Sequence, residues 1–262
     1  MGKEILEGIE LNRIYQMDCL EGMKLIPDKS IDMILCDLPY GTTACKWDTI
    51  IPFEPLWIQY ERIIKDNGSI VLFGGQPFTS ALVMSNPKIF KYSWVWKKSH
   101  SANFAVAKYV PLKRHEDILV FYKNKPTYNP QMTIGEYQNK RIGEVIGERE
   151  KDTYLTNKPK ILKNVKNNLY YPTTILDFNC GARKDSIHPT QKPVALFEYL
   201  IKTYTNERDI VLDNCMGSGT TAIAATISNR KWIGFETESK YVQLANKRLE
   251  QIQLEDDLKD YE

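Results

Sequence analysis

The sequence predicts an α/β fold built around a doubly wound sheet. β-rich runs alternate with segments whose apolar residues recur at helical spacing, a pattern typical of strands joined by crossover helices. The chain has 262 residues, of which 42% are hydrophobic, and this is enough for a sizeable core. Polar clusters follow three predicted strands, at Asp37–Tyr40, Asp213–Thr221 and Glu236. Because ligands bind at the carboxyl ends of strands in such sheets, these clusters predict a binding site.

Strands and helices alternate from the beginning of the chain. A short strand is predicted over Arg13–Asp18, and the helix that follows it stops before Pro27, which cannot continue a helix. The β-rich run Ile31–Cys36 is the next strand. Apolar residues at helical spacing then predict a helix over Pro55–Lys65, which Asn67-Gly68 is expected to close.

The apolar run Ser69–Phe73 predicts another strand, which ends at two glycines. A short helix over Phe78–Met84 and two strands, over Tyr92–Trp96 and Ile118–Tyr122, are expected to follow. From Lys123 to Ile187 the periodicity fades, and Lys, Asn, Tyr, Gly and Pro dominate. No strong element can be predicted there, so we interpret this segment as an insertion or a small subdomain.

Regular patterning returns in the last part of the chain. Helices are predicted over Pro193–Thr203, Thr220–Ser228 and Ser239–Leu254, and strands over Ile210–Asp213 and Trp232–Glu236. The helix at Thr220 directly follows a glycine-rich turn, so a strand, a turn and a helix occur in succession.

Basic residues are concentrated in the middle of the chain. The net charge is +2, yet the segment 88–187 carries +10 and the remainder −8. Between Lys88 and Arg114 there are seven basic residues and no acidic ones. A cationic surface for a polyanion would explain this distribution, and a solvated lysine-rich face would explain it equally well.

The cysteines are scattered and include no CxxC pair, which argues against structural zinc and against a disulfide framework. They are Cys19, Cys36, Cys45, Cys180 and Cys215. Cys36 lies in an apolar strand, so we expect a core residue and not a nucleophile. There is no long apolar stretch for a membrane span and no apolar signal core near Met1. We therefore expect a reduced, cytoplasmic protein that binds neither a membrane nor a metal.

The turn Asp213–Thr221 (DNCMGSGTT) leads from a strand into a helix. Its glycines permit positive φ and close approach of a ligand, and the helix N-terminus offers unpaired N–H groups. A phosphate loop would require a lysine after Gly219, and the dinucleotide pattern would require glycine at Ala222. Glu236 lies 23 residues after Asp213, where a carboxylate can accept hydrogen bonds from ribose hydroxyls. We expect a nucleoside-containing cofactor; a purely structural turn is the alternative.

The segment Asp37–Tyr40 (DLPY) forms a turn after a strand. Pro39 rigidifies this turn and restricts Leu38 to an extended conformation, so backbone carbonyls can point outward. The turn thus offers a carboxylate, a free carbonyl and an aromatic face, which suit a planar base with an amino group. Hydrogen bonds to both amino protons would favour a more tetrahedral nitrogen whose lone pair can attack. An ordinary strand-end turn is the alternative.

Together, these residues resemble the amino-group DNA methyltransferases of the D-P-P-Y type. Asp37–Tyr40 matches their catalytic motif, with Leu38 in place of the first proline. Asp213–Thr221 is similar to their D-P-F-x-G-S-G-T-T cofactor turn, with Asn214 and Cys215 replacing Pro and Phe. The catalytic turn comes early and the glycine turn late, as in the β-group of this family. The resemblance therefore implies a circularly permuted, Rossmann-like methyltransferase sheet.

Other segments extend the resemblance over about residues 12–252, most weakly over 123–187. His188–Pro193 (HPTQKP) matches the segment before the cofactor-contacting helix, and Arg114–Ile118 resembles the strand segment after the catalytic half. Asp18-Cys19 occupies the place of a contact with the cofactor adenine. The domains implied are a catalytic half (1–122), an inserted target-recognition region (123–187) and a cofactor-binding half (188–262).

The resemblance also implies S-adenosylmethionine as methyl donor and a flipped base of double-stranded DNA as acceptor. Asp37 and the Leu38 carbonyl would accept the amino protons, Tyr40 would stack on the base, and Pro39 would shape the turn. Glu236 would hold the ribose of the cofactor, and Thr190 and Lys192 would lie near its methionine carboxylate. The implied cofactor contacts are Asp18, Cys19, Asp37, Thr190, Lys192, Asp213, Gly217, Ser218, Gly219, Thr220, Thr221 and Glu236.

Side chains near the catalytic turn and in the basic segment are candidate DNA contacts, although Trp47 could equally anchor its loop on the core. They are Lys46, Trp47, Lys97, Lys98, His100, Lys108, Lys113 and Arg114. The acidic first position of the catalytic turn favours adenine N6 over cytosine N4. RNA as substrate and a non-catalytic DNA-binding module are the rivals. The recognised sequence, a homodimer and a cognate restriction endonuclease remain open.

Overall fold

The computed structural model describes residues 4–42, 48–144, 160–179 and 192–259. The chain forms two compact units, one comprising Met1–Asn129 with Thr174–Glu262 and the other comprising Pro130–Thr173. Among the described residues, no helix combines the length and the apolar character that crossing a membrane requires.

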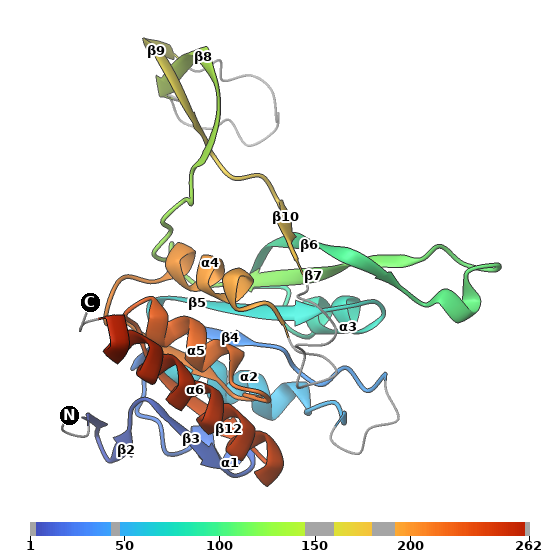
Figure 1. Cartoon of the computed structure of the whole chain (residues 1–262), viewed down its shortest axis with the longest axis vertical. Coiled ribbons are helices and arrows are strands. Elements are labelled where there is room, and N and C mark those ends of the chain that lie inside the picture. Colours follow the sequence, from blue (N-terminus) through green and yellow to red (C-terminus); the bar gives the residue numbers. More distant parts are fainter. Residues whose placement is uncertain (1–3, 43–47, 145–159, 180–191, 260–262) are drawn as a thin grey trace. The chain divides into compact units, whose positions relative to one another are not determined.

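An eight-stranded sheet forms the centre of the larger unit (Figure 1). In spatial order its strands are β10 (Ile175–Phe178), β6 (Phe90–Ala102), β7 (Lys113–Phe121), β5 (Ile64–Gly74), β4 (Ile31–Cys36), β11 (Ile210–Asp213), β12 (Lys231–Glu236) and β3 (Arg13–Gln16). Strand β7 is antiparallel to both neighbours, and every other adjacent pair is parallel. The predicted α/β class with a doubly wound sheet is confirmed.

Successive side chains of a strand point to opposite faces of the sheet, so the sheet has two apolar faces. In the part of the chain that the structure describes, three helices pack on each face. Met33 and Leu35 of β4 belong to one buried cluster, and Ile34 and Cys36 belong to the other. The first cluster includes residues of α4 (Val194–Tyr204), α5 (Thr220–Ile227) and α6 (Ser239–Lys259). The second includes residues of α1 (Cys19–Met23), α2 (Phe53–Ile63) and α3 (Phe78–Ser85). Cys36 is fully buried, as expected of a core residue.

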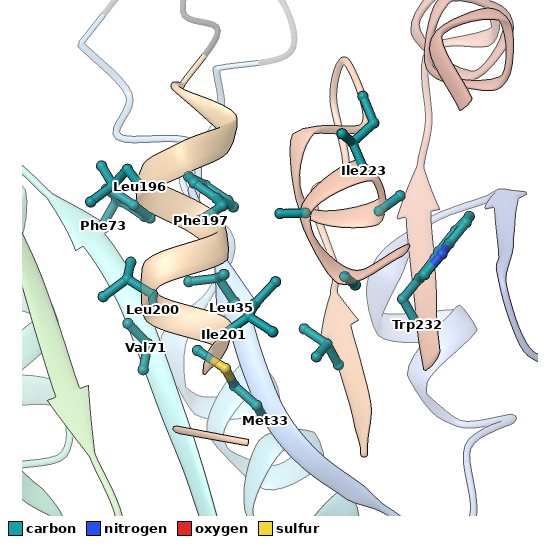
Figure 2. Packing of buried hydrophobic residues seen from close by; sticks show 14 of the residues in the cluster. Met33, Leu35, Val71, Phe73, Leu196, Phe197, Leu200, Ile201, Ile223 and Trp232 are labelled. Carbon is teal, nitrogen blue, oxygen red and sulfur yellow. The ribbon is translucent and has the colours of Figure 1, made fainter. Parts of the chain in front are cut away.

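Helix α4 packs on the central strands through aromatic and aliphatic contacts (Figure 2). The ring of Phe197 stacks on that of Phe73 in β5, with 5.0 Å between centroids and 9° between planes. Leu200 and Ile201 are fully buried in the same cluster. Each such side chain contributes about 1.5–3 kcal/mol through burial. This packing fixes the start of α4, where Lys192 and Pro193 precede the helix.

The strand order reverses between β4 and β11, which lie side by side at the centre of the sheet. The chain leaves β4 toward α2 on one face, and it leaves β11 toward α5 on the other. Two loops therefore diverge at the carboxyl ends of these strands. In open α/β sheets this divergence creates the crevice in which ligands bind.

The sequence placed a helix end at Asn67-Gly68, and the structure corrects this. Helix α2 ends at Ile63, and β5 begins immediately at Ile64. The turn-forming pair instead lies where the β4–β5 register shifts, between the pairings of Ile64 and Ser69. A Cβ on Gly68 would meet the backbone oxygen of Asp32 at 2.8 Å, so glycine suits this bulge.

The described part of residues 123–187 contains three strands, where the sequence permitted no strong prediction. Strands β8 (Thr133–Glu144) and β9 (Lys160–Tyr170) pair antiparallel in the smaller unit, and β10 joins the edge of the large sheet beside β6. The boundaries predicted for the inserted region differ from those of the compact unit 130–173, and its recognition role stays a prediction. The chain also contains the short strands β1 (Ile5–Leu6) and β2 (Ile9–Glu10).

Candidate active site

The polar clusters predicted from the sequence lie at the carboxyl ends of neighbouring strands in the large sheet. Asp37 follows the last residue of β4, and Asp213 is the last residue of the adjacent strand β11. Glu236 ends β12, which pairs with β11 on one side and with β3 on the other. Asp18 follows β3 by two residues. The topology thus brings residues from distant parts of the chain to neighbouring strand ends.

The turn after β4 is held by its own side chains. The Tyr40 hydroxyl donates a hydrogen bond to Oδ1 of Asp37 at 2.8 Å, and its ring stacks on Phe78 with 5.0 Å between centroids. Leu38 is buried, which anchors the backbone whose carbonyl would meet a substrate. Burial, reinforced by the charge of Asp37, raises the pKa of Tyr40 well above its usual value. The phenol therefore stays a hydrogen-bond donor.

Asp48 closes the loop that follows this turn. Its carboxylate accepts hydrogen bonds from the backbone N–H groups of Gly41 and Thr42, both at 2.9 Å. Gly41 has a φ of +67°, a conformation that glycine adopts without strain. No role for Asp48 was predicted from the sequence. An aspartate that caps the backbone N–H groups of a glycine turn is nevertheless a common arrangement.

A lysine from the other half of the chain reaches the catalytic turn. The ammonium group of Lys192, just before α4, contacts Oδ2 of Asp37 and lies 3.4 Å from Oε2 of Glu116. Lys98 of β6 contacts the other oxygen of Glu116. Burial alone would lower the pKa of Lys192, but the carboxylates of Asp37 and Glu116 outweigh it and raise this pKa. Lys192 is therefore held as a buried cation.

The glycine turn after β11 is organised by Asp213. One oxygen of this buried carboxylate accepts a hydrogen bond from the Cys215 N–H at 3.0 Å, and the other accepts one from the Thr221 hydroxyl. Burial raises the pKa of Asp213 to about 6. Gly217 and Gly219 have φ values of +52° and +82°. Asp213 thus fixes the shape of the turn through its side chain, and the side of the turn away from Asp213 presents backbone atoms.

The two glycines are required for different reasons. A Cβ on Gly219 would lie 2.7 Å from the Cβ of Ala245 in α6, so this glycine allows close helix packing. A Cβ on Gly217 would meet no heavy atom closer than 3.9 Å, so space is open beside it. The carboxylate of Glu236 accepts the Gly217 N–H at 2.8 Å and the Glu238 N–H at 2.9 Å. These bonds orient Glu236 beside the open space.

The DNA methylase family (N6_N4_Mtase) matches residues 31–247. The chain belongs to this family. M1.MboII, a type II methyltransferase of Moraxella bovis, is 30% identical over 94% of this chain and 99% of its own length. YhdJ of Escherichia coli K12, a DNA adenine methyltransferase, is 30% identical over 93% of this chain and 84% of its own length.

Solved structures of methyltransferases share the fold. The M1.HpyAVI–SAM complex has a TM-score of 0.58 and 26% identity, covering 90% of this chain and 98% of that one. The cytosine-N4-specific PvuII DNA methyltransferase has a TM-score of 0.61 at 17% identity, covering 89% and 84%, and shows the fold alone. The protein is thus a DNA methyltransferase of the N6/N4 family whose cofactor is S-adenosylmethionine.

The residues of this methyltransferase fit that cofactor in their donor chemistry. The glycine turn provides backbone N–H groups at the start of α5 with open space beside Gly217. Half-buried Glu236 would hold the ribose hydroxyls, because a carboxylate has about four acceptor sites and two backbone N–H groups use only part of them. Asp18 is exposed and caps α1 by accepting the N–H groups of Leu20 and Glu21 at 2.8 and 3.2 Å. Cys19 is buried beside it.

The predicted DNA contacts have different surroundings in the structure. Lys97, Lys98, His100, Lys113 and Arg114 all lie on the β6–β7 hairpin, and Lys108 lies in the loop at its tip (Figure 1). Lys98 is engaged with Glu116, and Lys97 forms an exposed ion pair with Asp177 at 2.6 Å. Arg114 donates to the Lys98 carbonyl at 3.1 Å. Lys46, Trp47 and Thr190 lie outside the described residues, so their roles stay predictions.

Proposed function

We propose that this DNA methyltransferase transfers the methyl group of S-adenosylmethionine to N6 of an adenine flipped out of duplex DNA. The observation that carries the proposal is the position of Asp37, held by Tyr40 and Lys192 beside the carboxyl end of β11. An acidic acceptor there suits an amino group, and the glycine turn for the cofactor follows the neighbouring strand.

The chain supplies acceptors and a stacking surface for this reaction. Asp37 and the Leu38 carbonyl accept the two amino protons, which favours a tetrahedral nitrogen with its lone pair free to attack. Tyr40 stacks on the base while Phe78 supports its ring from the protein side. S-adenosylmethionine supplies an electrophilic methyl group. The transfer is direct, so no residue needs to form a covalent bond, and buried Cys36 has no part in it.

The choice of adenine rests on Asp37, because the cytosine-N4 members of the family more often carry serine at this position. The relative YhdJ bears the name of an adenine methyltransferase, which supports the same choice. The test is transfer of a labelled methyl group to several duplex DNAs, followed by digestion to nucleosides. We expect the label in N6-methyl-2′-deoxyadenosine. Label in N4-methyl-2′-deoxycytidine would overturn the choice of base.

The β6–β7 hairpin is the proposed DNA-contacting surface. It carries the cations Lys108, Lys113 and Arg114, and its tip has exposed apolar side chains, among them Phe104 and Tyr109, which are 64% and 85% exposed. Lysine and arginine neutralise phosphates, and exposed rings can contact sugars and bases. We further propose that the insertion, which includes the compact unit 130–173, contributes recognition of the target sequence.

The role of Asp37 is tested with Asp37→Asn, which keeps the shape and removes the charge. We expect transfer to fall by about 100-fold or more while cofactor affinity changes little, since only the amino group loses its ionised acceptor. Asp66→Asn on the exposed surface is the matched control and should behave as the wild type. Wild-type turnover of the Asp37 variant would remove this residue from the mechanism. Absence of transfer by the wild type to any DNA would favour a binding module.

A further inference from the structure

Four charged groups of alternating sign contact one another in a row, near the carboxyl ends of the parallel strands. Asp37 contacts Lys192, Lys192 lies beside Glu116, and Glu116 contacts Lys98. These groups come from the β4 turn, the start of α4, β7 and β6. This series of charges begins at Asp37, the proposed acceptor of the amino protons, and ends at Lys98 on the hairpin that we propose contacts DNA.

The middle of this series of charges is buried. The side chains of Lys192 and Glu116 are only 8% and 11% exposed, and that of Asp37 is 25% exposed. Oε2 of Glu116 accepts no hydrogen bond from the residues that the structure describes, and its neighbour is the ammonium of Lys192 at 3.4 Å. The charges of Lys192 and Lys98 outweigh desolvation and lower the pKa of Glu116. Buried charges are stable in such an arrangement only while their partners remain.

We propose that Lys192 is a positioning residue for methyl transfer, which orients the Asp37 carboxylate, and that Glu116 holds Lys192 in place. This inference rests on the proposed function of Asp37. It assigns to Lys192 a different partner from the methionine carboxylate that the family resemblance implies.

The hydrogen bonds of Asp37 explain how the positioning works. Its Oδ1 accepts from Tyr40 and its Oδ2 from Lys192, so donors on both oxygens fix the plane of the carboxylate. Each oxygen has two acceptor sites and therefore keeps one for the target amino group. A protonated carboxyl group would present a donor there instead, and it would repel an amino proton.

The surroundings of Asp37 explain why the loss of Lys192 would disturb it. Tyr40 contacts Asp37 from its own turn, and Glu116 lies beyond Lys192, where it also contacts Lys98. Removal of the Lys192 charge would leave Oδ2 of Asp37 without this donor, and it would leave Asp37 and Glu116 as carboxylates with no cation between them. The carboxylate of Asp37 would then lose one of the two hydrogen bonds that fix its plane.

The test compares Lys192→Met with Lys192→Arg in the full-length protein, using duplex DNA and S-adenosylmethionine. For Lys192→Met we expect kcat to fall by about 100-fold, with the Kd for S-adenosylmethionine from calorimetry within about twofold of the wild type. Lys192→Arg should recover part of kcat, because arginine can also donate a hydrogen bond to Oδ2 of Asp37.

Two further variants separate this role from a structural one. Lys202→Met removes a lysine of α4, the helix that follows Lys192; its ion pair with Glu198 is partly exposed, and its loss should leave kcat unchanged. The double variant Lys192→Met/Glu116→Gln removes both charges of the buried pair, so it should fold even if the single variant does not. We expect its kcat to stay low, because Asp37 has still lost its donor.

Specific outcomes would overturn the inference. A wild-type kcat in Lys192→Met or in the double variant would show that Asp37 needs no donor from Lys192. Weakened cofactor binding with unchanged kcat would make Lys192 a cofactor contact. A wild type that methylates no DNA would instead overturn the proposed function itself.

Discussion

The hydroxyl of Tyr60 donates a buried hydrogen bond to Oδ1 of Asn214 at 2.6 Å. Tyr60 belongs to α2, and Asn214 belongs to the glycine turn after β11. Both side chains are almost completely buried. The bond therefore ties α2 to the glycine turn.

Replacing Tyr60 by phenylalanine should lower the stability of the protein. The Asn214 carbonyl would lose its donor inside the core, and a buried unsatisfied acceptor costs about 1–3 kcal/mol. Urea unfolding without cofactor would measure the change in the free energy of unfolding. The control is Tyr171→Phe, because that side chain is 74% exposed. Equal stability of the Tyr60 variant and the wild type would mean that Asn214 finds another donor.

The glycine and catalytic turns could be predicted from the sequence because each is a local feature. Each follows a short apolar strand directly, and Ile31–Cys36 and Ile210–Asp213 have the predicted bounds. Glycines and proline restrict the backbone of the residues beside them, so local sequence suffices to place such turns.

The ion pairs around Lys192 could not be predicted in this way. Lys192 and Asp37 are 155 residues apart, and only the pairing of β4 with β11 and the packing of α4 bring them together. Glu116 lies in the segment Arg114–Ile118 that resembles the methyltransferase family, yet its sequence neighbours do not indicate that it faces a lysine. The β6–β7 hairpin extends past the sheet as exposed strands, where no apolar alternation marks their length.

Lys108→Gln should weaken DNA binding at all sequences and flatten its salt dependence. Each phosphate contact contributes about 0.9 to the slope of log K against log salt, so the slope should decrease by about that amount. Lys97→Gln should have a smaller effect, because the charge of Lys97 already faces Asp177 at 2.6 Å. Fluorescence anisotropy with labelled duplexes at several salt concentrations would measure both. Lys29→Gln is the control, since Lys29 pairs with Asp66 outside the hairpin.

A slope unchanged in Lys108→Gln and lowered in Lys29→Gln would contradict the assignment of the hairpin. The effect on specificity provides a second check. Phosphate contacts position the protein without reading bases, so the ratio of specific to non-specific affinity should remain constant.

The buried carboxylate of Asp213 should make stability depend on pH. Burial raises its pKa to about 6 in the folded protein, whereas an unfolded aspartate titrates near 3.9. The folded state therefore binds the proton more tightly, and this group's contribution to stability falls as pH rises between these values. The fall amounts to about 3 kcal/mol for a shift of this size, and it is complete above pH 6.

Asp213→Asn isolates this contribution, because asparagine keeps an oxygen for the Cys215 N–H and carries no charge. Its free energy of unfolding relative to the wild type should increase by about 2–3 kcal/mol between pH 4 and pH 7.5. Urea unfolding of both proteins at each pH, without cofactor, would measure this difference. Differences between the proteins that are equal at both pH values would mean that Asp213 does not retain its proton more tightly on folding. The ionised state at neutral pH is then held by the Cys215 and Thr221 hydrogen bonds, which fully offset its burial.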